Sequence, residues 1–275
     1  MPKMKKSSDY EQCQIVEDEI ENNLESNPNS DLKVKLNAKP KKVRIKSVPQ
    51  VLSRFYYEEP NIIEIGVDEV GRGPLFGRVY SAAVILPKDD SFDHSKMKDS
   101  KKFTSKKKIE EVAKYIKEHS LSWNITYEDE KTIDNINILQ ATQKSMHNSI
   151  EGVISKYNKT HTFTENNKFI GLIDGNYFKP YTSFNKTKKM IEKLDHVCVE
   201  GGDNKFSAIA AASILAKVER DAYIEEMCKE YPDLSTKYCI DSNKGYGAKK
   251  HIEGIKEHGI TIWHRRSFGI CKEYV

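Results

Sequence analysis

From about residue 60 onward, short apolar runs alternate with helical patterns, and this alternation constrains the fold more than any other feature. Runs at 62–67 and 79–86 are rich in β-branched residues and flank a glycine-rich turn at 71–77, which favours a two-stranded hairpin. Residues 121–127 alternate apolar and polar as a half-exposed strand does, and 169–173 and 196–199 form two further short strands. Helical spacing occupies 105–119, 136–150, 206 to about 229 and about 248–257. The pattern predicts an α/β fold in which helices cover a mixed sheet.

Residues 1–58 have a different texture and are predicted to be a low-complexity, disordered arm before a domain at 59–275. Apolar residues are sparse and unperiodic there, so burial would not offset the entropy of ordering the chain. The arm carries an Asn, Ser and acidic patch at 21–31 and ends in a basic run, Lys39–Lys46. A nuclear-import signal, a nucleic-acid tether and a merely solvated tail all fit that run.

Composition excludes several classes of protein. No stretch has the length and apolarity of a membrane span, and no apolar run follows the basic amino terminus as a signal peptide requires. The five cysteines are scattered without any CxxC pair, and Cys228 and Cys239 with His251 and His258 match no common zinc spacing. We therefore expect reduced thiols in an intracellular protein, cytoplasmic by default and nuclear if the basic run is an import signal. A net charge of +4 leaves nucleic-acid attraction to local clusters.

Carboxylates stand where the predicted strands end. Asp68 follows the first strand and is followed by Glu69, Asp174 ends the strand at 169–173, and Asp203 lies just beyond the last strand. If the first and fourth strands are parallel neighbours, their ends are about 5 Å apart. Ligands usually bind beyond the carboxyl ends of strands in such sheets. A single Asp at a strand end is more often a turn former or helix cap, but four acids at one edge favour a shared site.

Clustered carboxylates repel one another unless cations neutralise them. Oxygen ligands select hard ions such as Mg²⁺ or Mn²⁺, which also bind phosphate oxygens. The constellation predicts metal-assisted transfer of a phosphoryl group to water. Gly71 and Gly73 also suggest a dinucleotide-binding loop, but that motif must open a helix, and here Pro74 and a strand follow.

The chain resembles the ribonuclease HII family, the type 2 ribonucleases H, over roughly residues 60 to 272. The resemblance rests on ordered motifs whose chance agreement is negligible. They are GVDEVGRGPL at 66–75, DSKK at 99–102, NIL at 137–139, LIDGN at 172–176, AASILAKVERD at 211–221, KGY at 244–246 and HRRSFG at 264–269.

This resemblance implies an RNase H-like fold, a mixed five-stranded sheet flanked by helices with a carboxy-terminal helical extension. It implies that Asp68, Glu69, Asp174 and Asp203 bind Mg²⁺ or Mn²⁺ and form the catalytic site. The implied enzyme is a monomer that cuts the RNA strand of RNA–DNA hybrids, and cuts 5′ to single ribonucleotides embedded in duplex DNA. Its products would carry 3′-hydroxyl and 5′-phosphate ends.

The same resemblance assigns substrate contacts. Only the 2′-hydroxyl separates ribose from deoxyribose, and a glycine loop lets backbone groups approach it closely. Similar enzymes read the ribonucleotide junction with this loop and a tyrosine, whereas phosphates are held by basic residues near a helix start. Without the resemblance, the tyrosine would be a half-buried core residue and the basic residues a solvated face. The predicted contacts are Gly71, Arg72, Gly73, Ser100, Lys101 and Tyr246, with Arg265 and Arg266 ranked below the lysines.

Two positions depart from the family pattern. Gly202 stands where relatives often carry lysine, which weakens phosphate neutralisation there, and Arg78 stands where a small residue is usual. Neither change removes a predicted metal ligand. Two rival functions remain, a catalytically silent binder of hybrids and a nuclease of related fold that acts on DNA junctions. The intact set of four acids argues against the silent binder. The DNA-junction nuclease is excluded if all-DNA substrates stay intact while ribonucleotide-containing substrates are cut.

Overall fold

The computed structural model describes residues 51–162, 164, 166–185 and 189–275, so most of the predicted arm, including Lys39–Lys46, lies outside the described residues. Residues 51–58 were assigned to the arm, yet they pack on the domain. Leu52 is buried, and Ser53 bridges to Phe206. The backbone N–H groups of residues 56 and 57 both donate to the buried carboxylate of Glu64, at 2.9 and 2.6 Å. The structured domain therefore begins earlier than the predicted residue 59.

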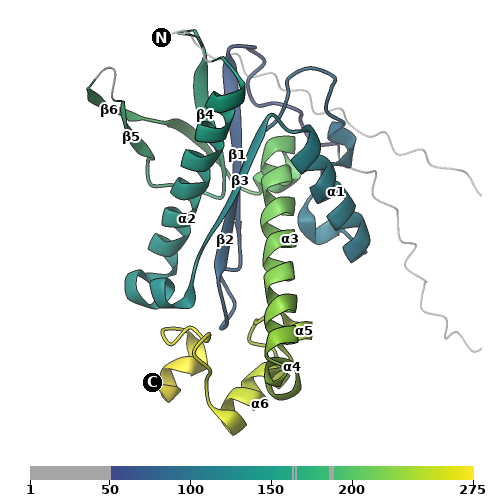
Figure 1. Cartoon of the computed structure of the whole chain (residues 1–275), viewed down its shortest axis with the longest axis vertical. Coiled ribbons are helices and arrows are strands. Elements are labelled where there is room, and N and C mark those ends of the chain that lie inside the picture. Colours follow the sequence, from purple (N-terminus) through teal and green to yellow (C-terminus); the bar gives the residue numbers. More distant parts are fainter. Residues whose placement is uncertain (1–50, 163, 165, 186–188) are drawn as a thin grey trace, which may run out of the picture. The chain divides into compact units, whose positions relative to one another are not determined.

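A five-stranded mixed sheet forms the centre of the domain, as predicted (Figure 1). Its spatial order is β3-β2-β1-β4-β7. The first three strands are antiparallel neighbours, whereas β4 and β7 run parallel to β1. The bounds are β1 Ile62–Val70, β2 Val79–Ile85, β3 Ser122–Glu128, β4 Lys168–Asp174 and β7 Asp195–Val199.

Alternation along β1 decides which helix covers which face. Ile65 and Val67 point into a core that they share with α2 (Glu130–Thr160), whereas Gly66 meets α3 (Ser207–Glu230) on the opposite face. A Cβ at position 66 would lie 2.2 Å from the backbone of Ala208, so glycine is needed for the alanine-rich helix to approach the sheet. Figure 1 shows α2 and α3 on either side of the strands, with α1 (Lys106–His119) beside α3.

The predicted helices are present with shifted ends. The helix predicted at 136–150 begins at Glu130, ends at Thr160, and is interrupted at Asn137, whose backbone φ of 66° is not helical. The side chain of Asn137 caps the segment that follows by accepting from the N–H of Gln140 at 3.1 Å. The helices at 105–119 and 206–229 agree with α1 and α3 to within one residue.

Two parts were not expected from the sequence pattern. Between β4 and β7 in the chain, β5 (Thr182–Asn185) and β6 (Met190–Lys193) form a hairpin that is a separate two-stranded sheet. The predicted C-terminal extension contains, besides α6 (Lys249–His258), two short helices, α4 (Asp233–Tyr238) and α5 (Ile240–Asn243). Short 3₁₀ turns complete the list: η1 His94–Lys96, η2 Ser100–Lys102, η3 Gly202–Asn204 and η4 Gly269–Tyr274. Among the described residues, no helix is long and apolar enough to cross a membrane.

Candidate active site

The four predicted metal ligands come from neighbouring elements. Val67 pairs with Ile173 in the parallel β1–β4 ladder, so Asp68 and Asp174 are the next residues on adjacent strands. Asp68 does not end its strand as predicted, because β1 continues to Val70 and Asp68 itself pairs with an alanine of β2. Its side chain consequently points to the α3 face of the sheet rather than into a loop. Asp203 lies in η3, immediately after β7.

Electrostatic coupling joins these acids into one cluster. Burial raises the pKa of Asp68 well above its usual range, and the neighbouring charges of Glu69 and Asp174 raise it further. Burial also raises the pKa of Asp174, with Asp203 adding to the rise. Burial raises the pKa of Glu69 as well, against the opposing pull of Arg72. The ionised set is therefore unfavourable in the folded chain alone, which is the condition that a cation relieves.

Hydrogen-bond donors orient the carboxylates. The N–H of Gly202 donates to Oδ1 of Asp174 at 2.6 Å, and the side-chain amide of Asn204 donates to Oδ1 of Asp203 at 3.0 Å. On α3, Ser213 provides a hydrogen bond that lowers the pKa of Asp68 and so favours its charged form. Neither Asn204 nor Ser213 was predicted as a site residue. The serine sits inside an alanine-rich helical pattern, and its sequence context carries no sign of a carboxylate partner.

The acids approach one another without forming a closed cage. In the described part of the chain, no three Asp, Glu, His or Cys side chains converge tightly enough to enclose an ion by themselves. Mg²⁺ and Mn²⁺ retain waters and bind through one or two carboxylates together with substrate phosphates, so they do not require a cage made of protein alone. The all-oxygen donor set of these four acids suits such an ion.

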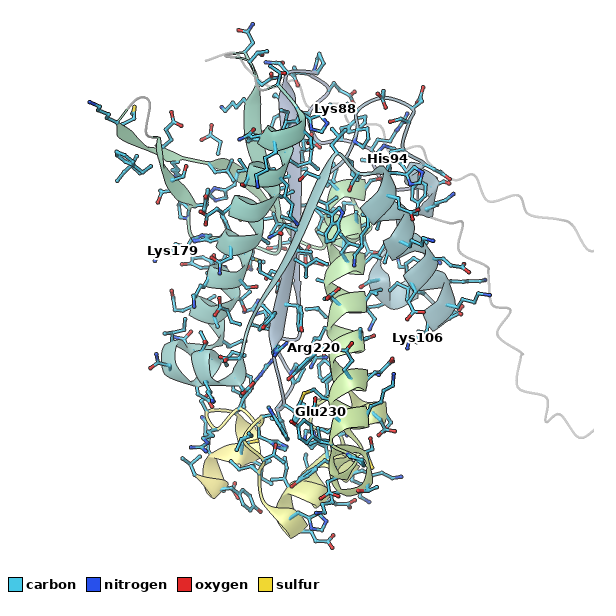
Figure 2. All side chains as sticks on the ribbon, viewed as in Figure 1. Lys88, His94, Lys106, Lys179, Arg220 and Glu230 are labelled. Atoms are coloured by element: carbon cyan, nitrogen blue, oxygen red, sulfur yellow. The ribbon has the colours of Figure 1, made fainter. Side chains whose placement is uncertain are left out.

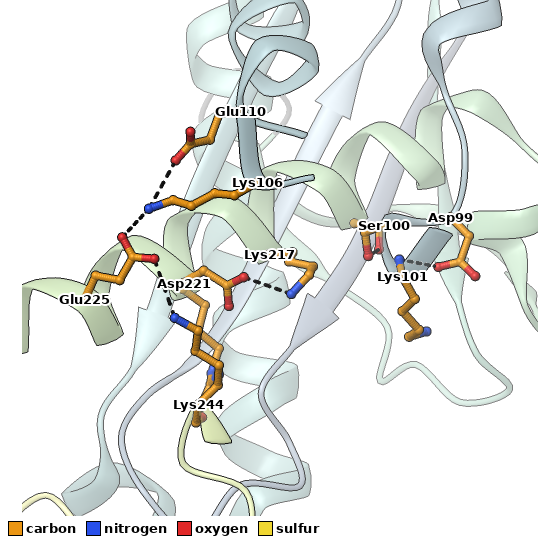
Figure 3. A network of polar contacts seen from close by, with 11 residues as sticks. Asp99, Ser100, Lys101, Lys106, Glu110, Lys217, Asp221, Glu225 and Lys244 are labelled. Carbon is orange, nitrogen blue, oxygen red and sulfur yellow. Dashed lines mark hydrogen bonds and ion pairs between the residues drawn. The ribbon is translucent and has the colours of Figure 1, made fainter. Parts of the chain in front are cut away.

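Lysine and serine from the DSKK segment reach the acidic cluster in different ways. Nζ of Lys101 lies 3.6 Å from Oδ2 of Asp203, and its side chain is 81% exposed and can meet a phosphate. The backbone N–H of Lys101 donates to Asp99 (Figure 3). Ser100 is buried, and its hydroxyl lies 3.1 Å from that of Ser213. The hydroxyl of Ser100 therefore contacts the serine that binds Asp68, and the predicted contact of Ser100 with a backbone phosphate stays a prediction.

Other lysines on this side are paired with acids. Lys106 binds both Glu110 and Glu225, and Lys244 also approaches Glu225, at 3.5 Å (Figure 3). Exposed pairs of this kind contribute little to stability. Lys101 differs from these lysines because its ion pair is with Asp203, one of the four acids of the cluster.

The glycine loop and the predicted tyrosine come together, although 173 residues separate Gly73 from Tyr246 in sequence. A Cβ at Gly73 would lie 3.5 Å from Cε1 of Tyr246, so the ring covers the loop at this point. Gly71 has a φ of 89°, which favours glycine, and Arg72 binds Glu69 through a 3.3 Å ion pair. Tyr246 is 47% exposed and available to a ligand.

The structure contradicts the predicted role of Arg265 as a phosphate contact. Its side chain is fully buried and donates to four backbone carbonyls. It holds the loop from below: Nε donates to Gly77 at 2.8 Å, Nη1 to Arg72 at 3.0 Å and Pro74 at 2.9 Å, and Nη2 to Gly71 at 2.6 Å. A guanidinium suits this role because it presents five donors in a rigid plane. Arg266, by contrast, is exposed, and its phosphate contact stays a prediction.

A second buried arginine, Arg220, was not predicted as a site residue. It lies on the C-terminal half of α3, near the C-terminal elements (Figure 2). Its Nε donates to the carbonyl of Arg78 at 3.4 Å, and its Nη2 donates to that of Lys244 at 2.9 Å. Arg220 therefore ties the end of the glycine loop to the segment that carries Tyr246.

Both departures from the family pattern have local explanations. The guanidinium of Arg78 lies 4.0 Å from the ring of Tyr127 and 4.4 Å from that of Tyr223, so two aromatic faces hold it. A Cβ at Gly202 would lie 2.5 Å from Cδ1 of Ile209. A lysine at 202 would therefore need the end of that isoleucine to move.

Known proteins are similar to the part of the chain that carries these residues. A family model for ribonuclease HII matches residues 65–271. The chain belongs to the ribonuclease HII family. It is 38% identical over 217 residues to the ribonuclease HII of Cytophaga hutchinsonii, covering 79% of this chain and 94% of that relative. The ribonuclease HII of Parabacteroides distasonis is 40% identical, with 79% and 95% covered.

Solved structures agree on the fold. The ribonuclease H2 from Pyrococcus horikoshii OT3 gives a TM-score of 0.56 at 19% identity, covering 77% of this chain and 96% of that one. Bst-RNase HIII in complex with Mn²⁺ gives 0.51 at 21%, covering 78% and 69%. The predicted RNase H-like α/β fold is confirmed. Membership of the ribonuclease HII family also confirms the prediction of an endoribonuclease acting on RNA paired to DNA.

Proposed function

We propose that the chain cuts on the 5′ side of ribonucleotides, in hybrids and at single ribonucleotides in duplex DNA, using Mg²⁺ or Mn²⁺ held by Asp68, Glu69, Asp174 and Asp203. The observation that carries the proposal is the meeting of these acids at one edge of the sheet, where Asp68 and Asp174 are the next residues after a paired position of β1 and β4 and Asp203 lies in η3. Burial there raises the pKa of Asp68, Glu69 and Asp174, and neighbouring carboxylates raise it further. Bound there, such ions would stabilise charge on the phosphodiester and lower the pKa of an attacking water.

The residues around the cluster have separable tasks. Gly202 and Ser213 hydrogen-bond to Asp174 and Asp68 respectively, which restricts the orientation of these two carboxylates. Lys101, exposed beside Asp203, is placed to neutralise a phosphate of the strand being cut. These contacts position the scissile phosphate over the acids.

Selection of ribose falls to the glycine loop and Tyr246. The backbone at Gly73 is open toward the ring, so a sugar can pack on the tyrosine while its 2′-hydroxyl reaches backbone groups. Arg265 and Arg220 hold the loop and the Lys244 segment from the protein interior. The reading surface is therefore built on buried, rigid supports.

A duplex with one embedded ribonucleotide tests the proposal. With Mn²⁺ or Mg²⁺ we expect one cut, 5′ to the ribonucleotide, leaving 3′-hydroxyl and 5′-phosphate ends, while the all-DNA duplex of the same sequence stays intact. Binding without cleavage under either ion would support a silent binder instead. Cleavage of the all-DNA duplex would support a nuclease of different specificity.

A further inference from the structure

Two histidines are fully buried beneath Tyr246 and touch each other. His251 lies on α6 and His264 lies in the segment that precedes Arg265; their relative exposures are 0% and 1%. Their Nε2 atoms are 3.0 Å apart, a hydrogen-bond distance that requires one ring to donate and the other to accept. Neither ring has a part in the proposed hydrolysis.

The partners at the two ends fix where the protons lie. The backbone N–H of Thr261 points to Nδ1 of His264 at 2.9 Å, so that nitrogen accepts and the proton of His264 is on Nε2. Nδ1 of His251 lies 2.8 Å from the carbonyl oxygen of Tyr246, which can only accept, so His251 carries its proton on Nδ1. Its Nε2 is then free to accept from His264. Both ends demand the same arrangement.

Only the neutral pair satisfies every contact. A second proton on His264 would direct an N–H at the N–H of Thr261, and a second proton on His251 would direct it at the N–H of His264. Burial lowers the pKa of both rings, and the His251 ring lowers that of His264 further, to about 3. Among the surrounding groups, the Tyr238 ring of α4 faces both histidines, and His258 lies beyond Tyr238.

The histidine chain links the two halves of the reading surface. At one end, His251 holds the carbonyl of Tyr246, whose ring covers Gly73. At the other end, the residue after His264 is Arg265, which holds the glycine loop from below. A backbone bond from Leu75 to the carbonyl of residue 245, at 2.8 Å, closes the ring of contacts. A change at either histidine would therefore be transmitted to the separation of Tyr246 and the loop.

We propose that His251 and His264 are positioning residues that set the place of Tyr246 over Gly73 through a fixed pair of tautomers. The pair would thereby tune selection of the junction between ribonucleotide and deoxyribonucleotide, without touching substrate. This inference rests on the proposed role of Tyr246. It assigns His251 the less common Nδ1–H tautomer and His264 the Nε2–H tautomer.

Nitrogen-15 NMR of the imidazole groups in the full chain at neutral pH tests the tautomers directly. We expect a protonated Nδ1 with an unprotonated Nε2 for His251, and the reverse for His264. Two rings of the same tautomer, or a charged ring at neutral pH, would overturn the proposal. The measurement needs no substitution and is independent of nuclease activity.

Substitution separates positioning from mere packing. In His251→Asn, the side-chain amide replaces the Nδ1–H donor of the imidazole. His251→Leu keeps a side chain of similar size but has no hydrogen-bond donor. The matched control is His119→Leu, at an exposed position on α1. We expect His251→Leu to lower cleavage at a single ribonucleotide about fivefold to tenfold more than cleavage of a long hybrid, as loss of one buried hydrogen bond implies. His251→Asn should restore the wild-type ratio.

An unchanged ratio in a folded His251→Leu protein would refute the positioning role. A wild-type chain that cuts neither substrate would instead refute the proposed function, so the two failures are distinguishable. Should His251→Leu not fold, two other measurements test the proposal. The proposal requires that His251→Asn cut the single ribonucleotide and the long hybrid in the wild-type ratio, and that the wild-type chain show the two assigned tautomers.

Discussion

The guanidinium of Arg265 donates a 2.6 Å hydrogen bond to the carbonyl of Gly71, a residue that lies 194 positions earlier in the chain. The bond anchors the start of the glycine loop to the C-terminal extension. The loop conformation, including the positive φ of Gly71, is thus maintained by a part of the chain that is remote in sequence. The glycine loop and the C-terminal extension are consequently one structural unit.

Replacing Arg265 tests this anchoring. Arg265→Lys keeps the charge but cannot reach four carbonyls from one ammonium, so buried acceptors lose their donors. We expect the free energy of unfolding to fall by about 3 kcal/mol or more, measured by urea denaturation, together with most of the cleavage. The exposed neighbour provides the control, and Arg266→Lys should change stability by less than about 0.5 kcal/mol. Equal effects of the two substitutions would contradict the anchoring role.

Neutralising Asp68 should separate activity from stability. Because burial and the charges of Glu69 and Asp174 raise its pKa, the ionised side chain destabilises the folded chain at neutral pH. Asp68→Asn should therefore abolish cleavage yet leave the melting temperature, measured without divalent ions, unchanged or higher. Asp90→Asn, an exposed position paired with Arg54, should leave cleavage at the wild-type rate. A lowered melting temperature for Asp68→Asn would contradict the assigned repulsion.

Removing the ring of Tyr246 should alter substrate preference. Tyr246→Ala uncovers Gly73, so we expect cleavage at single embedded ribonucleotides to fall more than cleavage of long hybrids, in which many sites are offered. Tyr246→Phe keeps the ring and should stay close to wild type. The measurement is kcat/KM on both substrates, and equal losses on the two would exclude a junction-reading role for the ring.

The buried histidines give the fold a defined pH dependence. The pKa of His264 is lowered to about 3, below the value of about 6.5 for an exposed imidazole, so the unfolded chain binds a proton that the folded chain does not. The free energy of unfolding should therefore fall as pH drops below about 6.5, by up to about 1.4 kcal/mol per pH unit from this group. The carboxylates with raised pKa values in the acidic cluster make the folded chain more stable as pH falls, which opposes the effect of His264. A variant that lacks His264 is therefore needed to isolate the contribution of the histidine.

Urea midpoints at pH 7 and pH 5 for the wild type and His264→Gln isolate the histidine contribution. Glutamine cannot be protonated in this range, so the variant should lose less stability on acidification than the wild type. An identical loss in both proteins would show that His264 is protonated in the folded chain as easily as in the unfolded one.

The spacing of apolar residues was enough to predict the central sheet, and the acidic residues near the strand ends indicated which side chains to examine. Short apolar runs and one alternating segment predicted all five strands of the central sheet, and acids near the strand ends predicted that Asp68 and Asp174 would be neighbours, because both depend on short-range pattern. Asp68 shows the limit of this pattern: the sequence predicted that the strand ends there, but Glu69 and Val70 continue it and pair with β2.

What the sequence did not reveal depends on contacts between distant segments. Arg265 and Arg266 are identical neighbours, yet one is buried under the loop and the other is exposed, and no local signal separates them. Ser213 is inside a helix whose composition indicates only close packing. The hairpin at 182–193 has short, exposed strands that bury little, so its pattern was too weak to predict.

The most direct test of the central claim is to measure Mn²⁺ binding and cleavage together in acid-to-amide variants. Electron paramagnetic resonance of free Mn²⁺ reports binding, and a duplex with one ribonucleotide reports cleavage. The account predicts that Asp174→Asn and Asp203→Asn weaken both measurements in parallel, while Asp90→Asn changes neither. Wild-type Mn²⁺ binding and cleavage in Asp174→Asn or Asp203→Asn would contradict a metal site shared across β1, β4 and η3.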